Sequence, residues 1–100
     1  MASSFLQQVA DYMRTRRYAK RTIETYQHWI RFYILFHKKQ HPSQLGNTEV
    51  EQFLTWLAVE RHVAFKSQSS ALNALVFLYR EFLQQPLSLQ LNFNAAKTPP

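Results

Sequence analysis

The sequence predicts an all-α domain, and both its composition and its apolar periodicity favour that class. Glycine occurs once in 100 residues, whereas 46% of the residues are hydrophobic and 15% are aromatic. A chain of this length and composition buries enough apolar surface to fold as one domain. Apolar side chains recur at spacings of three and four residues in four stretches, which is the spacing of amphipathic helices.

The first two helices are predicted over residues 3–16 and 20–39. Ser3 or Ser4 is expected to cap the first helix, whose apolar stripe contains Phe5, Val9, Tyr12 and Met13. The second helix follows Ala19, which has no side-chain acceptor for a cap. It is apolar on most of its circumference, so we expect it to lie at the centre of the domain. Its stripes contain Ile23, Tyr26, Trp29, Ile30, Phe32, Tyr33, Phe36 and His37.

The third and fourth helices are predicted over residues 47–61 and 66–85. A connection over residues 41–46 contains Pro42 and the single glycine, and Asn47 or Thr48 is expected to cap the third helix. Residues 62–65 form a loop before the fourth helix, which Pro86 ends. Their core positions are Val50, Phe53, Leu54, Leu57, Ala58, Ala71, Leu72, Leu75, Leu78, Tyr79, Phe82 and Leu83. The organisation predicted is a domain over residues 1–86 and a linker over 87–100.

The whole chain has a formal net charge of +6. The positive charge is concentrated in its first half. Residues 14–39 contain eight Lys or Arg against one acid, Glu24, and residues 40–60 contain three acids and no Lys or Arg. Such an asymmetry predicts one surface that meets a polyanion and another that does not.

The sequence offers little for catalysis or for metal binding. It has no cysteine, no glycine-rich phosphate loop and no apolar run long enough to cross a bilayer. His37 and His41 have a spacing that can hold a metal on a helix, but Pro42 ends the helix there and no third ligand is evident. Glu49 and Glu51 fit the first turn of a helix better than a catalytic pair. We therefore expect no metal, no cofactor and a location in a reducing cytoplasm.

Binding residues are predicted at two helix starts. Lysine, arginine and serine suit phosphates, and glutamine and asparagine suit base edges. These predicted site residues are Lys20, Arg21, Thr22, Lys66, Ser67, Gln68, Ser70 and Asn73. Nucleic acid is one candidate partner. A helical protein–protein module that uses exposed aromatics around residues 29–36 is the alternative.

The order of motifs resembles the N-terminal domain of integron integrases, within the tyrosine recombinase (phage integrase) family. The resemblance covers about residues 5–85. It rests on Arg21-Thr22, Tyr26, Trp29-Ile30, Phe32, Phe36-His37, His41-Pro42, Leu45-Gly46, Glu49-Val50, Phe53-Leu54, Leu57-Ala58, Gln68, Ala71-Leu72-Asn73-Ala74-Leu75 and Phe77-Leu78-Tyr79. Thr22 and Tyr26 mark only the broad family, whereas the run from His41 to Val50 and the stretch 71–79 are more specific to the integron branch.

The resemblance implies a compact, orthogonally packed four-helix SAM-like core-binding domain, whose second and fourth helices approach the major groove of a recombination site. It implies a DNA partner, including folded single strands of gene cassettes, an oligomer on DNA in the full-length protein, and bacterial cytoplasmic, nucleoid-associated action. The family's catalytic arginines, histidine and tyrosine have no counterparts here, so this chain is expected to bind DNA without cutting it. Ala19 stands where the family often has serine.

Overall fold

The computed structural model describes residues 2–87, and within that range it contains helices and no strand. The helices are α1 (Ala2–Thr15), α2 (Lys20–Phe36), α3 (Asn47–Val59) and α4 (Phe65–Phe77). Two short segments complete the fold, a 3-10 turn η1 (Pro42–Gln44) and a π-helical turn η2 (Leu78–Phe82) that continues α4. The predicted all-α class is confirmed.

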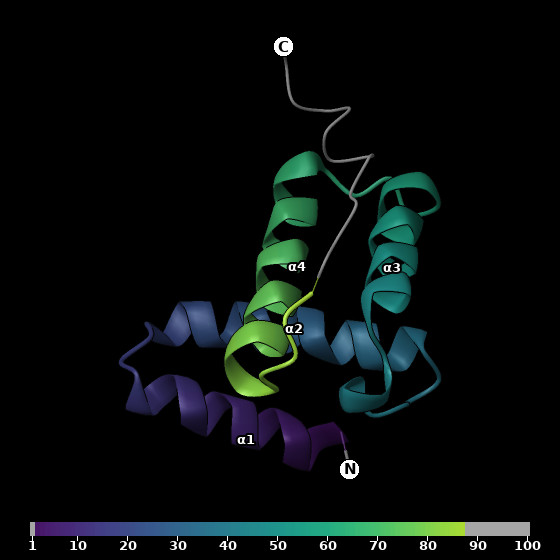
Figure 1. Cartoon of the computed structure of the whole chain (residues 1–100). Helices are drawn as coiled ribbons and strands as arrows, with labels where there is room; N and C mark the ends of the chain where they lie inside the picture. Colours follow the sequence, from purple (N-terminus) through teal and green to yellow (C-terminus); the bar gives the residue numbers. More distant parts are fainter. Residues whose placement is uncertain (1, 88–100) are drawn as a thin grey trace.

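The four helices form a crosswise bundle with α2 at its centre. In Figure 1, α3 and α4 stand beside one another across α2, and α1 runs below α2. The most extensive packing of α2 is against α4 and α1, and it also contacts α3. This arrangement explains why α2 is apolar on several sides, as predicted for a central helix.

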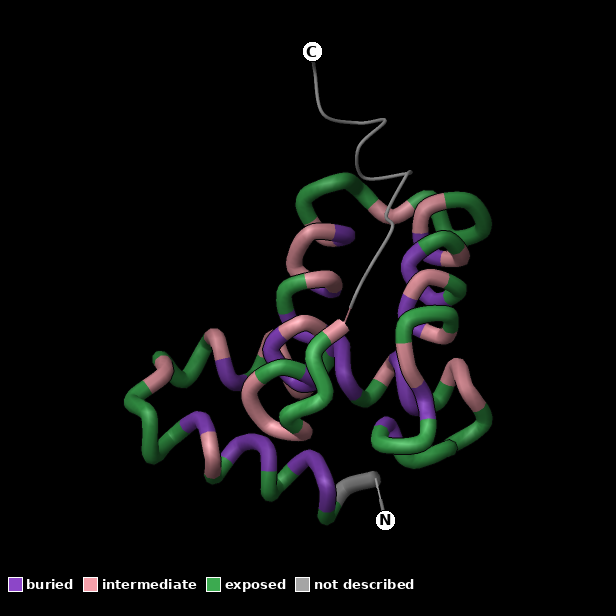
Figure 2. The backbone as a smooth tube through the Cα atoms, viewed as in Figure 1, coloured by how far each residue is buried: buried purple, intermediate pink, exposed green. Residues whose placement is uncertain are grey.

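The core gathers one buried stripe from each helix, as Figure 2 shows in purple. Trp29 is 9% exposed, so its predicted burial is confirmed. The central residues that are completely buried include Val9, Met13, Ile30, Tyr33, Phe53, Leu57, Leu75 and Tyr79. Several other predicted core aromatics are only partly buried and pack around this centre, among them Tyr12, Tyr26, Phe32 and Phe36.

The ends of the first two helices differ from the prediction. α1 begins at Ala2, so Ser3 and Ser4 lie inside its first turn rather than at its cap. α2 ends at Phe36 instead of continuing to Lys39, because Lys38 adopts a left-handed backbone with φ 58°. The amide of Lys39 then donates to the carbonyl of Ile34 at 2.8 Å, a helix-terminating bond that usually accompanies glycine. Residues 37–40 contain no glycine or proline from which the end of the helix could have been predicted.

The last two helices also begin and end differently. Gly46, not Asn47 or Thr48, is the N-cap of α3, and its amide donates to the Glu49 carboxylate at 2.8 Å. α4 begins one residue before Lys66 and passes at Leu78 into the π-helical turn, which ends at Phe82 rather than near Gln85. Of the predicted linker, only Leu87 lies within the described residues.

Two tyrosine hydroxyls form a buried hydrogen-bonded chain that joins α2, η2 and the α2–α3 connection. Tyr79 Oη donates to the carbonyl of Pro42 at 2.7 Å, and Tyr33 Oη lies 2.9 Å from Tyr79 Oη. Tyr79 uses its proton on Pro42, so Tyr33 must donate to Tyr79. Burial raises the pKa of both phenols, that of Tyr79 to about 12, and the nearby Glu49 charge adds to the effect.

We expect this pair to make the fold sensitive to alkali. The folded-state pKa of Tyr79 lies above its ordinary value of 10.0, so the folded chain keeps a proton that the unfolded chain has lost. The contribution is fully present below pH 10 and declines as the pH rises towards 12, by up to about 1.4 kcal/mol per pH unit for one hydroxyl. Urea unfolding at several pH values between 9 and 12 measures the slope.

Tyr79→Phe is the matched variant for that experiment. It should cost about 1–3 kcal/mol at neutral pH because the Pro42 carbonyl loses its donor. Its stability should then fall less steeply above pH 10 than that of the wild type. Parallel pH profiles for the two proteins would contradict the assignment of the alkaline loss to Tyr79.

Candidate nucleic-acid interface

The start of α2 presents free backbone donors together with two cations. Lys20 and Arg21 are exposed, Thr22 is half-buried, and the N-cap residue Ala19 supplies no side-chain acceptor. The first amides of the helix are therefore left for solvent or for an anion. Because the helix dipole is also positive here, the two cations reinforce a site that favours negative charge.

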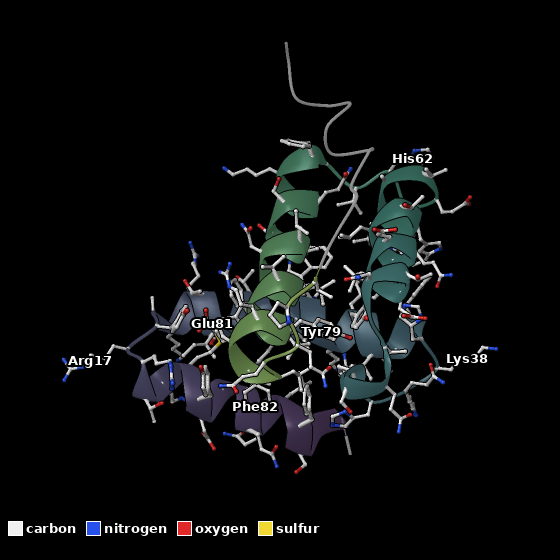
Figure 3. The ribbon with its side chains drawn as sticks, in the orientation of Figure 1. Arg17, Lys38, His62, Tyr79, Glu81 and Phe82 are labelled. Carbon is white, nitrogen blue, oxygen red and sulfur yellow. The ribbon has the colours of Figure 1, made fainter. Side chains whose placement is uncertain are left out.

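The turn between α1 and α2 adds a third cation to this site. Arg14 pairs with Asp11 at 2.9 Å, and the Arg16 guanidinium lies 3.7 Å from the centre of the Tyr12 ring. Arg17 has a left-handed backbone with φ 65°, and Figure 3 shows its side chain projecting from the tip of the turn. Arg17, Lys20 and Arg21 take part in neither of the two ion pairs found within residues 2–87. We call these three residues the cationic corner.

An aromatic contact joins the end of α4 to two tyrosines near the cationic corner. The ring of Phe77, on the last turn of α4, lies 5.5 Å from that of Tyr18 and 5.4 Å from that of Tyr26. Asn73 is exposed and lies one turn before Phe77. The packing therefore brings the exposed side of α4 at Asn73 towards the start of α2, although the two segments are 50 residues apart in sequence.

The start of α4 extends the surface away from the corner. Lys66 is exposed, Ser67 and Ser70 are half-buried, and the N-cap residue Ala64 has no side-chain acceptor. Lys66 lies eleven residues before Phe77, so it is about 16 Å farther along the helix axis. The predicted site residues are thus spread along α4 from Lys66 to Asn73 and on to the start of α2, rather than gathered in a single pocket.

Gln68 does not belong to that surface. It is only 4% exposed, and its Nε2 donates to the carbonyl of Val63 at 2.7 Å. Its Oε1 is buried and has no hydrogen-bond partner. The prediction of Gln68 as a groove contact overlooked this role in the α3–α4 connection, since one polar residue among several at a helix start gives no sign of its burial. We leave it out of the candidate interface.

The two histidines considered as metal ligands make other interactions. His37 Nε2 lies 2.9 Å from the carbonyl oxygen of Glu49, and His41 Nδ1 accepts from the amide of Ser43 at 3.1 Å. Among the described residues, no group of three or more His, Asp or Glu side chains could hold a metal ion.

Burial, and to a lesser degree the neighbouring Tyr18, raises the pKa of Tyr26, which makes its hydroxyl a poorer nucleophile.

The aromatic residues of α2 are largely used inside the molecule. Trp29 stacks on Phe32 with ring centres 6.1 Å apart, and Phe36 packs on Trp56 of α3 at 4.8 Å. The large hydrophobic residue that stays exposed in this stretch is Leu35, at 41%. The alternative prediction was a partner surface made of exposed aromatics around residues 29–36. Most of the aromatic surface of this stretch is instead buried inside the molecule, so little of it is left for a partner.

Exposed cations gathered at a helix start are the electrostatic feature expected of a surface that meets a polyanion. The chain belongs to a known family of domains, because the family model described as phage integrase, N-terminal SAM-like domain, matches residues 5–89. Two relatives described as "Integrase/recombinase", from Escherichia coli and Pseudomonas aeruginosa, are each 45% identical over 78 residues. That alignment covers 78% of this chain but only 23% of each relative. No helix within residues 2–87 is long and apolar enough to span a membrane.

Proposed function

We propose that this chain is the DNA-binding N-terminal domain of an integron-type site-specific tyrosine recombinase. The observation that carries the proposal is the cationic corner, where Lys20 and Arg21 stand at an uncapped helix start without an internal ion pair. The family membership and the relatives described as integrase/recombinase support it. The DNA would be recombination sites, both duplex and folded single strands of gene cassettes.

The two ends of the surface would have different tasks. Lys20, Arg21 and Thr22 contact phosphates, with Arg17 beside them, because cations and free helix amides both attract phosphate oxygens. The α4 residues Lys66, Ser67, Ser70 and Asn73 lie along the groove, where the Asn73 amide suits an adenine edge. Lys66 lies seven residues before Asn73, a distance of about 10 Å along the helix axis that is close to the major-groove width of about 12 Å.

In the full recombinase this domain would form one half of a clamp around DNA, and copies would assemble on the site. Its action would take place in the bacterial cytoplasm, at the nucleoid. The chemistry of strand exchange would need residues outside the domain that matches residues 5–89.

We expect the isolated chain to have no strand-cleavage activity. Tyr26 is the more accessible of the two α2 tyrosines, but burial raises its pKa, and within residues 2–87 no hydrogen bond from an arginine or a histidine to its hydroxyl is found. The measurement is incubation with a nicked suicide substrate, followed by denaturing electrophoresis. A covalent protein–DNA product that survives denaturation would overturn this expectation.

Replacing Lys20 and Arg21 together with Gln should weaken DNA binding while leaving the fold intact. The two cations oppose the helix dipole by roughly 0.3–1 kcal/mol each, so the variant should melt at the same temperature as the wild type or slightly higher. The slope of log K against log salt should fall by about two contacts. Fluorescence titration with a labelled duplex, together with thermal melting, provides both quantities.

Lys38→Gln/Lys39→Gln is the matched control, because it removes the same charge at the opposite end of α2, where Figure 3 shows Lys38. It should keep most of the affinity and the wild-type salt slope. If the two double variants lose affinity equally, binding follows net charge alone. If Lys20→Gln/Arg21→Gln melts earlier yet binds DNA normally, those cations are structural and the DNA surface lies elsewhere.

A further inference from the structure

Phe65, the first residue of α4, is the one aromatic side chain within residues 2–87 that stays on the surface. It is 45% exposed, whereas every other phenylalanine, tyrosine and tryptophan in that range is buried or half-buried. Each of those others also packs on at least one further aromatic ring. No ring contact found between residues 2 and 87 includes Phe65, so the packing of the bundle gives its exposed ring no role.

The surroundings of Phe65 are cationic and polar. Lys66 follows it and is exposed, and Arg61 and His62 precede it in the α3–α4 connection, where Figure 3 shows His62. From Arg61 to Arg80 the chain contains no aspartate or glutamate. Such a segment attracts negative charge. The ligand that fits this part of the surface is therefore an anion that also has an apolar face.

A nucleotide has both of these properties. Its phosphate is attracted by lysine, and the flat face of its base stacks on an aromatic side chain. In duplex DNA the bases are stacked on one another and present only their edges in the grooves. A phenyl ring has no hydrogen-bond donor or acceptor with which to read those edges. The face of the Phe65 ring therefore suits a base that is unpaired.

Phe65 lies at one end of the predicted DNA contacts on α4. Lys66 and Asn73 are seven residues apart, so they lie on the same side of the helix, and Phe65 comes directly before the first of them. In Figure 1 the start of α4 is at the end of the bundle away from α1. The ring thus borders the proposed DNA surface at its outer end.

We propose that Phe65 stacks on an unpaired base of the bound DNA, while Lys66 contacts a neighbouring phosphate. This inference rests on the proposed function, because it adds a residue to the same DNA surface. It gives the domain a means of distinguishing DNA that has unpaired nucleotides from continuous duplex. Since all four bases have a face that can stack, the preference depends little on base sequence.

Titration of wild type and Phe65→Ala with three fluorescently labelled probes of equal length tests the stacking. The probes are a strand of about 16 thymidines, an abasic strand with the same backbone, and a duplex. Phe65→Ala should bind the thymidine strand roughly 5- to 100-fold more weakly, which is the effect of losing one stacked base. The two proteins should agree within about twofold on the abasic strand and on the duplex, because neither probe offers the face of an unpaired base.

Two further variants separate stacking from a general apolar contact. Phe65→Leu keeps an exposed apolar side chain without a ring, so it should lose affinity for the thymidine strand as Phe65→Ala does. Leu35→Ala truncates an apolar side chain of similar exposure, 41%, on α2. It should bind all three probes as the wild type does. Thermal melting checks that each variant is folded.

The possible failures are distinguishable. If Phe65→Ala or Phe65→Leu binds the thymidine strand as tightly as the wild type, Phe65 does not stack on bases, and the proposed function stands as long as the duplex is bound. Equal losses on the duplex and on the thymidine strand would also overturn the assignment to an unpaired base. A wild-type chain that binds none of the probes at low salt would overturn the proposed function, and this inference with it.

Discussion

Trp29→Ala should lose about 3–5 kcal/mol of stability, the usual cost of truncating a large buried aromatic side chain. Trp29 is 9% exposed, its ring is nearly parallel to that of Phe32, and His28 packs on its edge at 4.9 Å. Alanine would leave a cavity on the central helix, where α1, α3 and α4 all pack. Because a domain of this size has only about 5–15 kcal/mol in total, the variant should be largely unfolded or melt much earlier.

Leu35→Ala on the same helix is the matched control for this experiment. Leu35 is 41% exposed, so its truncation should change stability by no more than about 0.5 kcal/mol. Urea unfolding followed by circular dichroism compares the two variants with the wild type. A Trp29→Ala protein with the midpoint of the wild type would mean that the indole contributes nothing to the core and is retained for a partner.

The central role of α2 could be predicted because apolar periodicity is a local property of the sequence. A helix that is apolar on most sides needs neighbours on most sides, and Ile30, Tyr33 and Trp29 are buried accordingly. The order of the four helices followed from the same periodicity, with Pro42 and Gly46 marking the one long connection.

The ends of the helices could not be predicted in the same way. A chain with one glycine must end its helices on other residues, and Arg17 and Lys38 adopt left-handed backbones at the ends of α1 and α2. Either residue is also a good helix former, so its type alone did not reveal the turn. The π-helical turn at Leu78–Phe82 likewise has no local signature in the sequence. One contact to it is long-range, because the hydroxyl of Tyr12 on α1 donates to the Glu81 carbonyl at 3.1 Å.

The candidate site was predictable in composition but not in arrangement. Residue type singled out Lys20, Arg21 and Lys66 as candidate DNA contacts, and all three are exposed. The approach of Asn73 to the start of α2 depends on Phe77 packing against Tyr18 and Tyr26, a long-range contact that no local pattern encodes. The burial of Gln68 and the exposure of Arg17 at the tip of its turn also arise from tertiary packing.

The central claim is that exposed cations on one surface bind the phosphates of DNA. Four exposed cations are available to that surface, namely Arg17, Lys20, Arg21 and Lys66. Each phosphate contact contributes a slope of about −0.9 to log K against log salt, so raising salt from about 50 to 200 mM should reduce affinity on the order of 10²-fold. An apolar contact with a protein partner would respond weakly to the same change.

Titration of a labelled recombination-site duplex with the wild-type chain, at three salt concentrations between about 50 and 200 mM, is the most direct test of that claim. The account predicts weak binding whose affinity falls on the order of 10²-fold across that range, with a slope near that of three to five phosphate contacts. An affinity that stays flat over the same range, or no binding at the lowest salt, would contradict it.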